Sequence, residues 1–135
     1  MGDVTFSVGD DAGGWLAIAD ADQLDQVLWA LLDNAAKYGQ RAPITAHVTV
    51  DAAAARLRLA IADGGPGIPE SDRERLFARF ARGTAGTSMD GSGLGLYVSR
   101  ELVRAMDGDL VLEPAEPGRG AVFTVILPAE PGLET

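Results

Sequence analysis

The sequence predicts a two-layer α/β sandwich with a largely antiparallel sheet. Two observations lead to this fold class. The expected elements run in the order strands, helix, two strands, helix, loop, helix, two strands. The chain has 135 residues, 47% of them hydrophobic, which is enough for one compact core and too little for two. We therefore expect one domain over residues 1–128 and a frayed polar tail over residues 129–135.

The composition excludes several classes of protein. No apolar run approaches the roughly 18 residues of a membrane span, and no signal peptide opens the chain, so a cytoplasmic domain without direct membrane contact is expected. Without cysteine there is no disulfide, thiolate zinc site or cysteine nucleophile, and the single histidine, His47, cannot form a histidine cluster. The net charge of -9 opposes nucleic acid as a partner, so any phosphate site must be built locally.

The first elements are a strand pair and a helix. Residues 4–8 and 15–19 alternate as strands and are expected to form a hairpin. Asp20 and Gln23 have the spacing of a capping box, and a helix is expected from there to Gly39. The apolar stripe of this helix consists of Leu24, Val27, Leu28, Leu31, Leu32 and Ala35.

The middle of the chain is expected to continue with two strands, a rigid loop and a short helix. The strands, residues 44–50 and 57–62, pair through the turn at residues 51–55. The loop, ADGGPGIP at residues 62–69, holds three glycines and two prolines. A short helix over residues 71–80 follows it.

The last third is expected to hold a loop, a helix and two strands. Residues 82–92 are small, polar and glycine-rich, which predicts a mobile loop. A helix over residues 93–106 has apolar side chains spaced by four. Strands near residues 110–113 and over residues 121–127 close the fold.

Four groups of residues could carry chemistry. They are Asn34 with Lys37 on the first helix, Asp63 in DGGPG, Phe77 with Phe80 in RLFARFAR, and GSGLGL at residues 91–96. Singly, each has a structural explanation: an exposed helix flank, a turn cap, core anchors and a loop-to-helix junction. Together, in this order, they resemble the N box, first glycine box, F box and second glycine box of the histidine-kinase ATP-binding domain.

The resemblance runs over residues 24–127 and includes the closing GRGAVFTVILP. It implies the Bergerat ATP-binding fold, a mixed, mostly antiparallel sheet with helices on one face, shared with gyrase, the ninety-kilodalton heat-shock chaperone and MutL. It also implies that the domain binds Mg-ATP and donates the γ-phosphoryl group to a histidine on a separate dimerisation and phosphoacceptor domain. A response regulator is the next partner, and the parent kinase can be membrane-anchored.

Adenine recognition is expected at Asp63. Its carboxylate, at a strand end where Gly65 and Gly67 keep the backbone open, can accept the exocyclic amine of adenine in a charge-assisted bond. Guanine would present an acceptor there instead, so ATP is expected over GTP.

Phosphate and metal binding are expected at the other boxes. The neutral amide oxygen of Asn34 suits Mg²⁺, and by resemblance Lys37 and Tyr38 face phosphate and sugar or base, while Arg82 reaches the terminal phosphate. Residues 82–92 would form the ATP lid. The resemblance gives Asn34, Lys37 and Arg82 as catalytic residues. The nucleotide-binding set is Asn34, Lys37, Tyr38, Asp63, Gly65, Gly67, Ile68, Phe80, Arg82, Gly91, Ser92, Gly93, Leu94, Gly95 and Leu96.

Departures from the family motif bear on the activity. Ala30 stands one helical turn before Asn34, where ATP-hydrolysing relatives carry a glutamate base, which disfavours a gyrase-like or chaperone-like ATPase. Asp107 replaces the first of the usual paired glycines after the last helix. His47 lies inside an expected strand and is interpreted as structural. Two alternatives stay open: an anti-sigma-factor-type serine kinase, and a nucleotide-binding interaction module without transfer activity.

Overall fold

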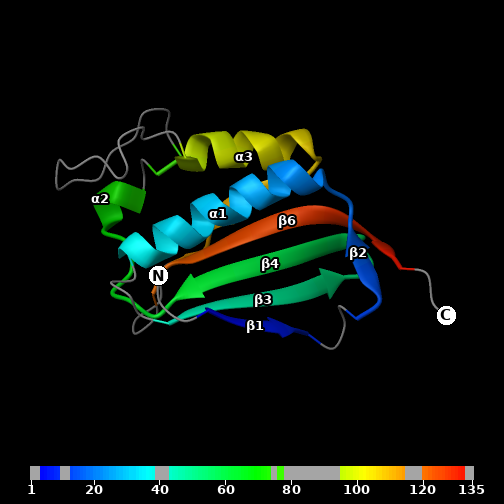
Figure 1. Cartoon of the computed structure of the whole chain (residues 1–135), viewed down its shortest axis with the longest axis horizontal. Helices are drawn as coiled ribbons and strands as arrows, with labels where there is room; N and C mark the ends of the chain where they lie inside the picture. Colours follow the sequence, from blue (N-terminus) through cyan, green and yellow to red (C-terminus); the bar gives the residue numbers. More distant parts are fainter. Residues whose placement is uncertain are drawn as a thin grey trace.

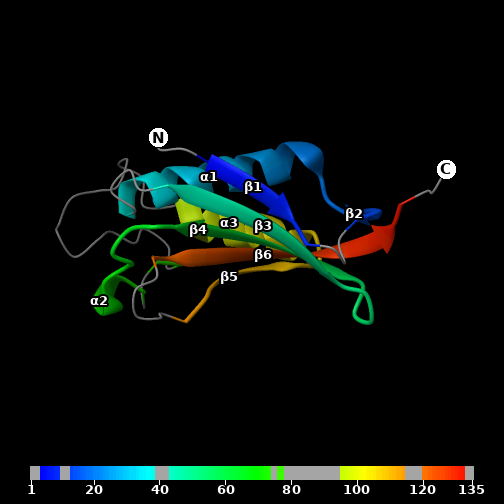
Figure 2. The ribbon, with the colours of Figure 1, turned by 90° about the horizontal axis from the view of Figure 1, so that it is seen from below.

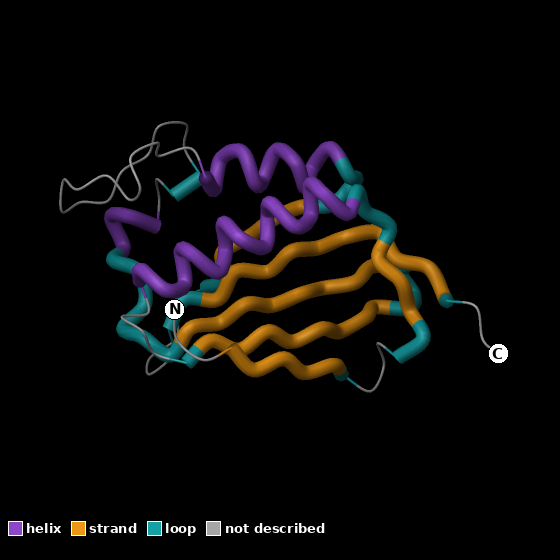
Figure 3. The backbone as a smooth tube through the Cα atoms, viewed as in Figure 1, coloured by secondary structure: helices purple, strands orange, loops and turns teal. Residues whose placement is uncertain are grey.

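The structure is a computed structural model that describes residues 4–9, 13–38, 43–73, 76–77, 95–114 and 120–132. In this part of the chain, helices cover one face of a six-stranded sheet (Figures 1 and 3). The strands twist relative to one another across the sheet, as the turned view in Figure 2 shows. The predicted two-layer α/β sandwich is therefore confirmed.

The sheet is mixed, with one parallel pair of strands. Its strands are β1 (Val4–Val8), β2 (Trp15–Ala17), β3 (Ile44–Asp51), β4 (Arg56–Asp63), β5 (Asp109–Leu112) and β6 (Val122–Pro131). They are ordered β1-β3-β4-β6-β2, and β5 also pairs with β6. Only β1 with β3 is parallel among the described pairs; the others are antiparallel.

The expected hairpin between the first two strands is wrong. β1 pairs with β3, with Val4 opposite Ile44, whereas β2 pairs with β6, with Trp15 opposite Pro131. Alternating side chains specify a strand and its buried face, but they do not specify which sheet edge the strand joins. That choice depends on strands that are distant in the sequence.

The expected frayed tail is also wrong over its first three residues. β6 continues to Pro131 because residues 129–131 pair with β2, and Ala129 is buried. The backbone N–H of Gly132 then donates to the carbonyl of Gly14. Residues 133–135 lie outside the described part of the chain.

The first helix, α1 (Ala21–Tyr38), follows the prediction closely. The N–H of Gln23 donates to Oδ1 of Asp20 at 3.0 Å, which caps the helix as the spacing indicated. The predicted stripe faces the sheet, and its members Val27 and Leu31 are fully buried. No helix in the described ranges is both long and apolar enough to cross a bilayer.

The two later helices end earlier in the sequence than expected. α2 (Glu70–Arg73) has four residues, and residues 74–75 and 78–80 of the predicted helix lie outside the described part. α3 (Gly95–Ala105) ends before Asp107, which has a φ of 64°. The N–H of Gly108 donates to the carbonyl of Val103, so the chain reverses through a left-handed residue at the helix end.

The core lies between the helices and the sheet. Its fully buried side chains are Val27, Leu31, Ile44, Val103, Leu110, Phe123, Val125 and Leu127. On the other face of the sheet, Thr45, His47 and Arg58 are exposed. His47 is thus a strand residue, as interpreted, with its side chain on the face away from the helices.

Candidate functional site

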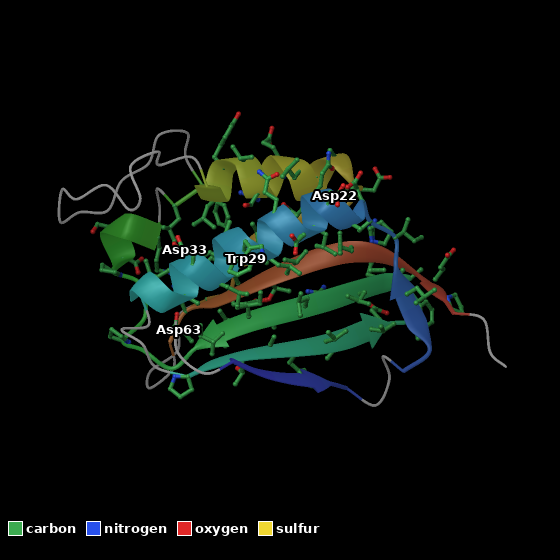
Figure 4. All side chains as sticks on the ribbon, in the orientation of Figure 1. Asp22, Trp29, Asp33 and Asp63 are labelled. Atoms are coloured by element: carbon green, nitrogen blue, oxygen red, sulfur yellow. The ribbon has the colours of Figure 1, made fainter. Side chains whose placement is uncertain are left out.

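The predicted site residues that the structure describes lie at one end of the sandwich. Asp63 is the last residue of β4, and Asn34 lies near the C-terminal end of α1, which packs against β4. Figure 4 shows Asp63 beside the end of α1 that carries Asp33, whereas Asp22 lies at the opposite end of that helix. α2 and the start of α3 lie at the same end of the molecule (Figure 1).

Asp63 is buried, with 5% of its surface exposed, and is held by backbone groups on two sides. Its Oδ1 accepts the N–H of Gly65 at 2.9 Å, and its own N–H donates to the carbonyl of Ala121 at 3.1 Å. The bond from the Gly65 N–H closes a tight local turn, a conformation that aspartate followed by glycine favours. Among the described residues nothing donates to Oδ2. Of the two carboxylate oxygens, only Oδ1 thus has a donor within the described part of the chain.

Asn34 is buried as well, which corrects the expected exposed flank. It follows Val27 and Leu31 at helical spacing and so continues their buried stripe, and only 8% of its surface is exposed. Its Nδ2 is buried and has no hydrogen-bond partner within the described chain. A buried donor without an acceptor lowers the stability of the fold by about 1–3 kcal/mol, unless a ligand or solvent accepts its hydrogen bond. Rotating the side-chain amide by 180° would place its oxygen where Nδ2 now lies. Asn34 could then act as a ligand to a cation.

The DGGPG loop combines a glycine turn with a core anchor. Gly67 has a φ of 88°, in the region that favours glycine. Ile68 is buried in the core, so its described role is packing. Gly65 supplies the N–H that Asp63 accepts.

The other predicted residues are only partly described. α3 begins at Gly95, and Leu96 is buried in the core. Lys37 and Tyr38 form the last turn of α1, but their side chains are outside the described part. Also outside it are Phe80, Arg82, Gly91, Ser92, Gly93 and Leu94, and with them the expected lid at residues 82–92.

Phe77 is the described member of the F box. Its ring meets that of Phe123 edge to face, with centroids 6.2 Å apart. The Arg100 guanidinium carbon lies 5.0 Å from the centroid of the same ring. Phe77 therefore packs at the border of the core, as its structural explanation expected, and carries a cation on its face.

Arg100 also joins α3 to β5, a link the sequence analysis missed. Its Nε donates to Oδ1 of Asp109 at 3.0 Å, and Nε of Arg104 donates to the same oxygen at 3.1 Å. Burial acts to raise the pKa of Asp109, but hydrogen bonds from Arg100, the N–H of Leu110 and Arg104 outweigh it, so the pKa lies below its usual value. Two arginines one helical turn apart were the signal available in the sequence.

The described residues offer one candidate metal ligand rather than a cluster of ligands. In the described ranges no three His, Cys, Asp or Glu side chains gather to form a metal site. The buried, unpartnered amide of Asn34 is nevertheless a fitting single ligand for Mg²⁺ whose other ligands are phosphate and water oxygens.

The family follows from a match over most of the chain. Residues 19–131 match the model described as histidine kinase-, DNA gyrase B- and HSP90-like ATPase. The chain belongs to this ATPase family. The resemblance inferred from the four boxes is thereby confirmed.

Named relatives include a sensor protein and a signal transduction histidine-protein kinase/phosphatase. Sensor protein EvgS of Escherichia coli O157:H7 is 37% identical over 119 residues, covering 86% of this chain. The signal transduction histidine-protein kinase/phosphatase MprB of Mycobacterium sp. strain KMS is 37% identical over 132 residues, covering 96% of it. This ATPase-family domain spans only 10% of the length of EvgS and 25% of that of MprB.

Two solved structures share the fold. The mycobacterial sensor histidine kinase MprB superposes with a TM-score of 0.77 at 31% identity, over 96% of this chain and 84% of that one. Full-length ShkA in complex with AMPPNP gives a TM-score of 0.76 at 27% identity, over 98% of this chain and 26% of that one. The expected Bergerat-type fold of the ATPase domain is therefore confirmed.

Proposed function

We propose that this domain binds Mg-ATP and donates the γ-phosphoryl group to a histidine on a separate dimerisation and phosphoacceptor domain. One observation carries the proposal. At one end of the sandwich, two buried polar side chains, Asp63 and Asn34, each keep a polar atom without a partner in the described chain. An acceptor and an amide held ready in this way suit a ligand with an amino group and a cation.

Asp63 would bind the adenine. Its Oδ2 would accept the exocyclic amine, while the Gly65 N–H keeps Oδ1 in place. The buried environment strengthens this bond and makes an unsatisfied alternative costly, which favours ATP over GTP.

Asn34 would bind the metal through its amide oxygen, and Lys37, Tyr38 and Arg82 would contact the nucleotide as their boxes imply. When bound, Mg²⁺ neutralises phosphate charge that a protein of net charge -9 does not balance by itself. The glycines and leucines at residues 91–96 would bring backbone close to the phosphates at the start of α3.

In the transfer, the bond from the γ-phosphorus to the bridging oxygen of ADP breaks as a bond to the histidine nitrogen forms. ADP leaves with the electron pair, and the imidazole loses its proton to solvent. The acceptor histidine and the response regulator that follows it belong to other domains, since His47 is on the face of the sheet away from Asp63. We place the domain in the cytoplasm, on a parent kinase that can be membrane-anchored.

Calorimetric titration tests the binding step. ATP should bind the parent more tightly with Mg²⁺ than without it, and more tightly than GTP. In Asn34→Ala, Mg²⁺ should no longer strengthen ATP binding, whereas adenosine should bind as in the parent. Gln26→Ala is the matched control, because Gln26 is exposed on the same helix. Equal Mg²⁺ dependence in Asn34→Ala and the parent would remove Asn34 from the site.

Labelling tests the transfer step. The domain, γ-labelled ATP and a helical phosphoacceptor domain should together give acid-labile label on the acceptor. Acid-stable label on a serine of a partner would favour the serine-kinase alternative, and ATP binding without any transfer would favour the interaction module.

A further inference from the structure

Gly120 lies directly against the carboxylate of Asp63. A Cβ atom at position 120 would be 2.3 Å from both the carbonyl oxygen and Oδ1 of Asp63, and 2.9 Å from its carbonyl carbon. Real Cβ atoms do not approach other heavy atoms so closely. Position 120 and the Asp63 side chain therefore compete for the same space, and only a glycine at 120 leaves that space to the carboxylate.

The two segments cannot easily move apart to make room. The N–H of Asp63 donates to the carbonyl of Ala121, the residue after Gly120, and β4 and β6 pair immediately beyond, with Ala62 opposite Val122. A methyl group at position 120 would strike two oxygens of Asp63, so the backbone must shift slightly at the carbonyl and the carboxylate must rotate. Rotation would break the bond from the Gly65 N–H to Oδ1 and redirect Oδ2.

We infer that Gly120 is a positioning residue for purine recognition. Having no side chain, it sets the orientation of the Asp63 carboxylate and so lets the site choose a purine with an amino group at position six over one with a carbonyl group there. The inference rests on the proposed function and extends it from Asp63 to a residue 57 positions later in the sequence.

A purely structural role is the competing explanation, and Gly108 provides the matched control. A Cβ at position 108 would lie 1.9 Å from the carbonyl oxygen of Ile126, a contact at least as close as those at position 120. Gly108 follows α3 at the end of the sandwich away from Asp63 (Figure 1). Gly13 is the second control, because nothing lies within 4 Å of a Cβ placed there.

The experiment compares ATP with inosine triphosphate, which carries a carbonyl in place of the amino group. Dissociation constants are measured by calorimetry in saturating Mg²⁺ for the parent, Gly120→Ala, Gly108→Ala and Gly13→Ala. Gly120→Ala should weaken ATP binding about tenfold or more and leave inosine triphosphate within a few-fold, so that the preference between them collapses. Gly108→Ala should lower Tm yet keep the parental preference, and Gly13→Ala should change neither.

A double-mutant cycle shows whether Gly120 acts through Asp63. In the Asp63→Asn background, Gly120→Ala should cost little further ATP affinity, because the group that it displaces has already lost its charge. Full additivity of the two losses would mean that Gly120 acts elsewhere.

Each further outcome decides between the claims. A parent that does not distinguish the two nucleotides refutes the proposed role of Asp63. A parent that distinguishes them, with a Gly120→Ala variant that loses both equally or does not fold even with nucleotide, refutes the positioning role of Gly120 alone.

Discussion

At the residue scale, the site depends on side chains that are buried but not fully paired. Asp63 and Asn34 are 5% and 8% exposed. Buried polar atoms without partners are rare in folded proteins because desolvation is costly. Among the described residues, Nδ2 of Asn34 is such an atom, and a bound ligand explains it better than stability does.

Replacing Asp63 by asparagine should separate binding from folding. The amide oxygen can still accept the Gly65 N–H, so Tm should stay within a few degrees of the parent. ATP affinity should fall about 10- to 100-fold, because a charge-assisted bond worth roughly 1.5–3 kcal/mol is weakened. Calorimetry and thermal melts measure the two effects. Unchanged ATP affinity would contradict the adenine assignment.

Replacing Asp107 by glycine should stabilise the fold. Asp107 has a φ of 64°, which costs an L-residue more than glycine, and the hydrogen bond from Arg56 reaches its backbone carbonyl rather than its side chain. Asp107→Gly should raise the free energy of unfolding by roughly 0.5–1 kcal/mol in urea titration. Gly108→Ala, one residue later, should lower it. A destabilised Asp107→Gly would show that the carboxylate has a contact worth more than the strain.

At the element scale, Arg100 of α3 links its helix to two other segments of the fold. The Arg100 guanidinium lies over the ring of Phe77 and bonds to Asp109 at the start of β5. Phe77 in turn meets Phe123 of β6. The helix that opens with the second glycine box is thus tied to the F box and to the sheet by contacts outside the nucleotide-binding set.

The Asp109 cluster should give the fold a pH dependence. The pKa of Asp109 is below its usual value in the folded state, so its ion pairs stabilise the protein above the unfolded pKa of about 4 and are lost as pH falls through the lower folded pKa. Asp109→Asn should therefore destabilise the domain near neutral pH, and this difference should shrink in acid. Urea titrations at several pH values measure it, with Asp25→Asn, an exposed change on α1, as control. A difference independent of pH would contradict the ion-pair account.

At the scale of the whole molecule, the site combines elements far apart in the sequence. The C-terminal end of α1, the end of β4 and the start of β6 meet at one end of the sheet, and the opposite end holds the start of α1 (Figure 4). Ala30, one helical turn before Asn34, has no carboxylate, and His47 lies on the face of the sheet away from the helices.

The isolated chain should therefore bind ATP without consuming it quickly. Position 30 holds alanine, so no carboxylate there can activate a water molecule for attack on ATP. His47 is separated from Asp63 by the sheet. Incubation with γ-labelled ATP should give no label on the chain and free phosphate at only a slow rate. Rapid release of phosphate would support an ATPase, and label on His47 would show that the sheet does not separate the two.

The sequence by itself determined the fold class, the capped first helix and the two central strands, because periodicity, capping and glycine turns are local signals. It also singled out Asn34 and Asp63 as candidate site residues through the order of the four boxes. Only the tertiary structure decided that β1 joins β3 and β2 joins β6, that β6 runs to Pro131, and that Asn34 is buried. It also brought Gly120 against Asp63 and Arg100 over Phe77. These are contacts between segments far apart in the chain, and they depend on how the sheet assembles rather than on any local pattern.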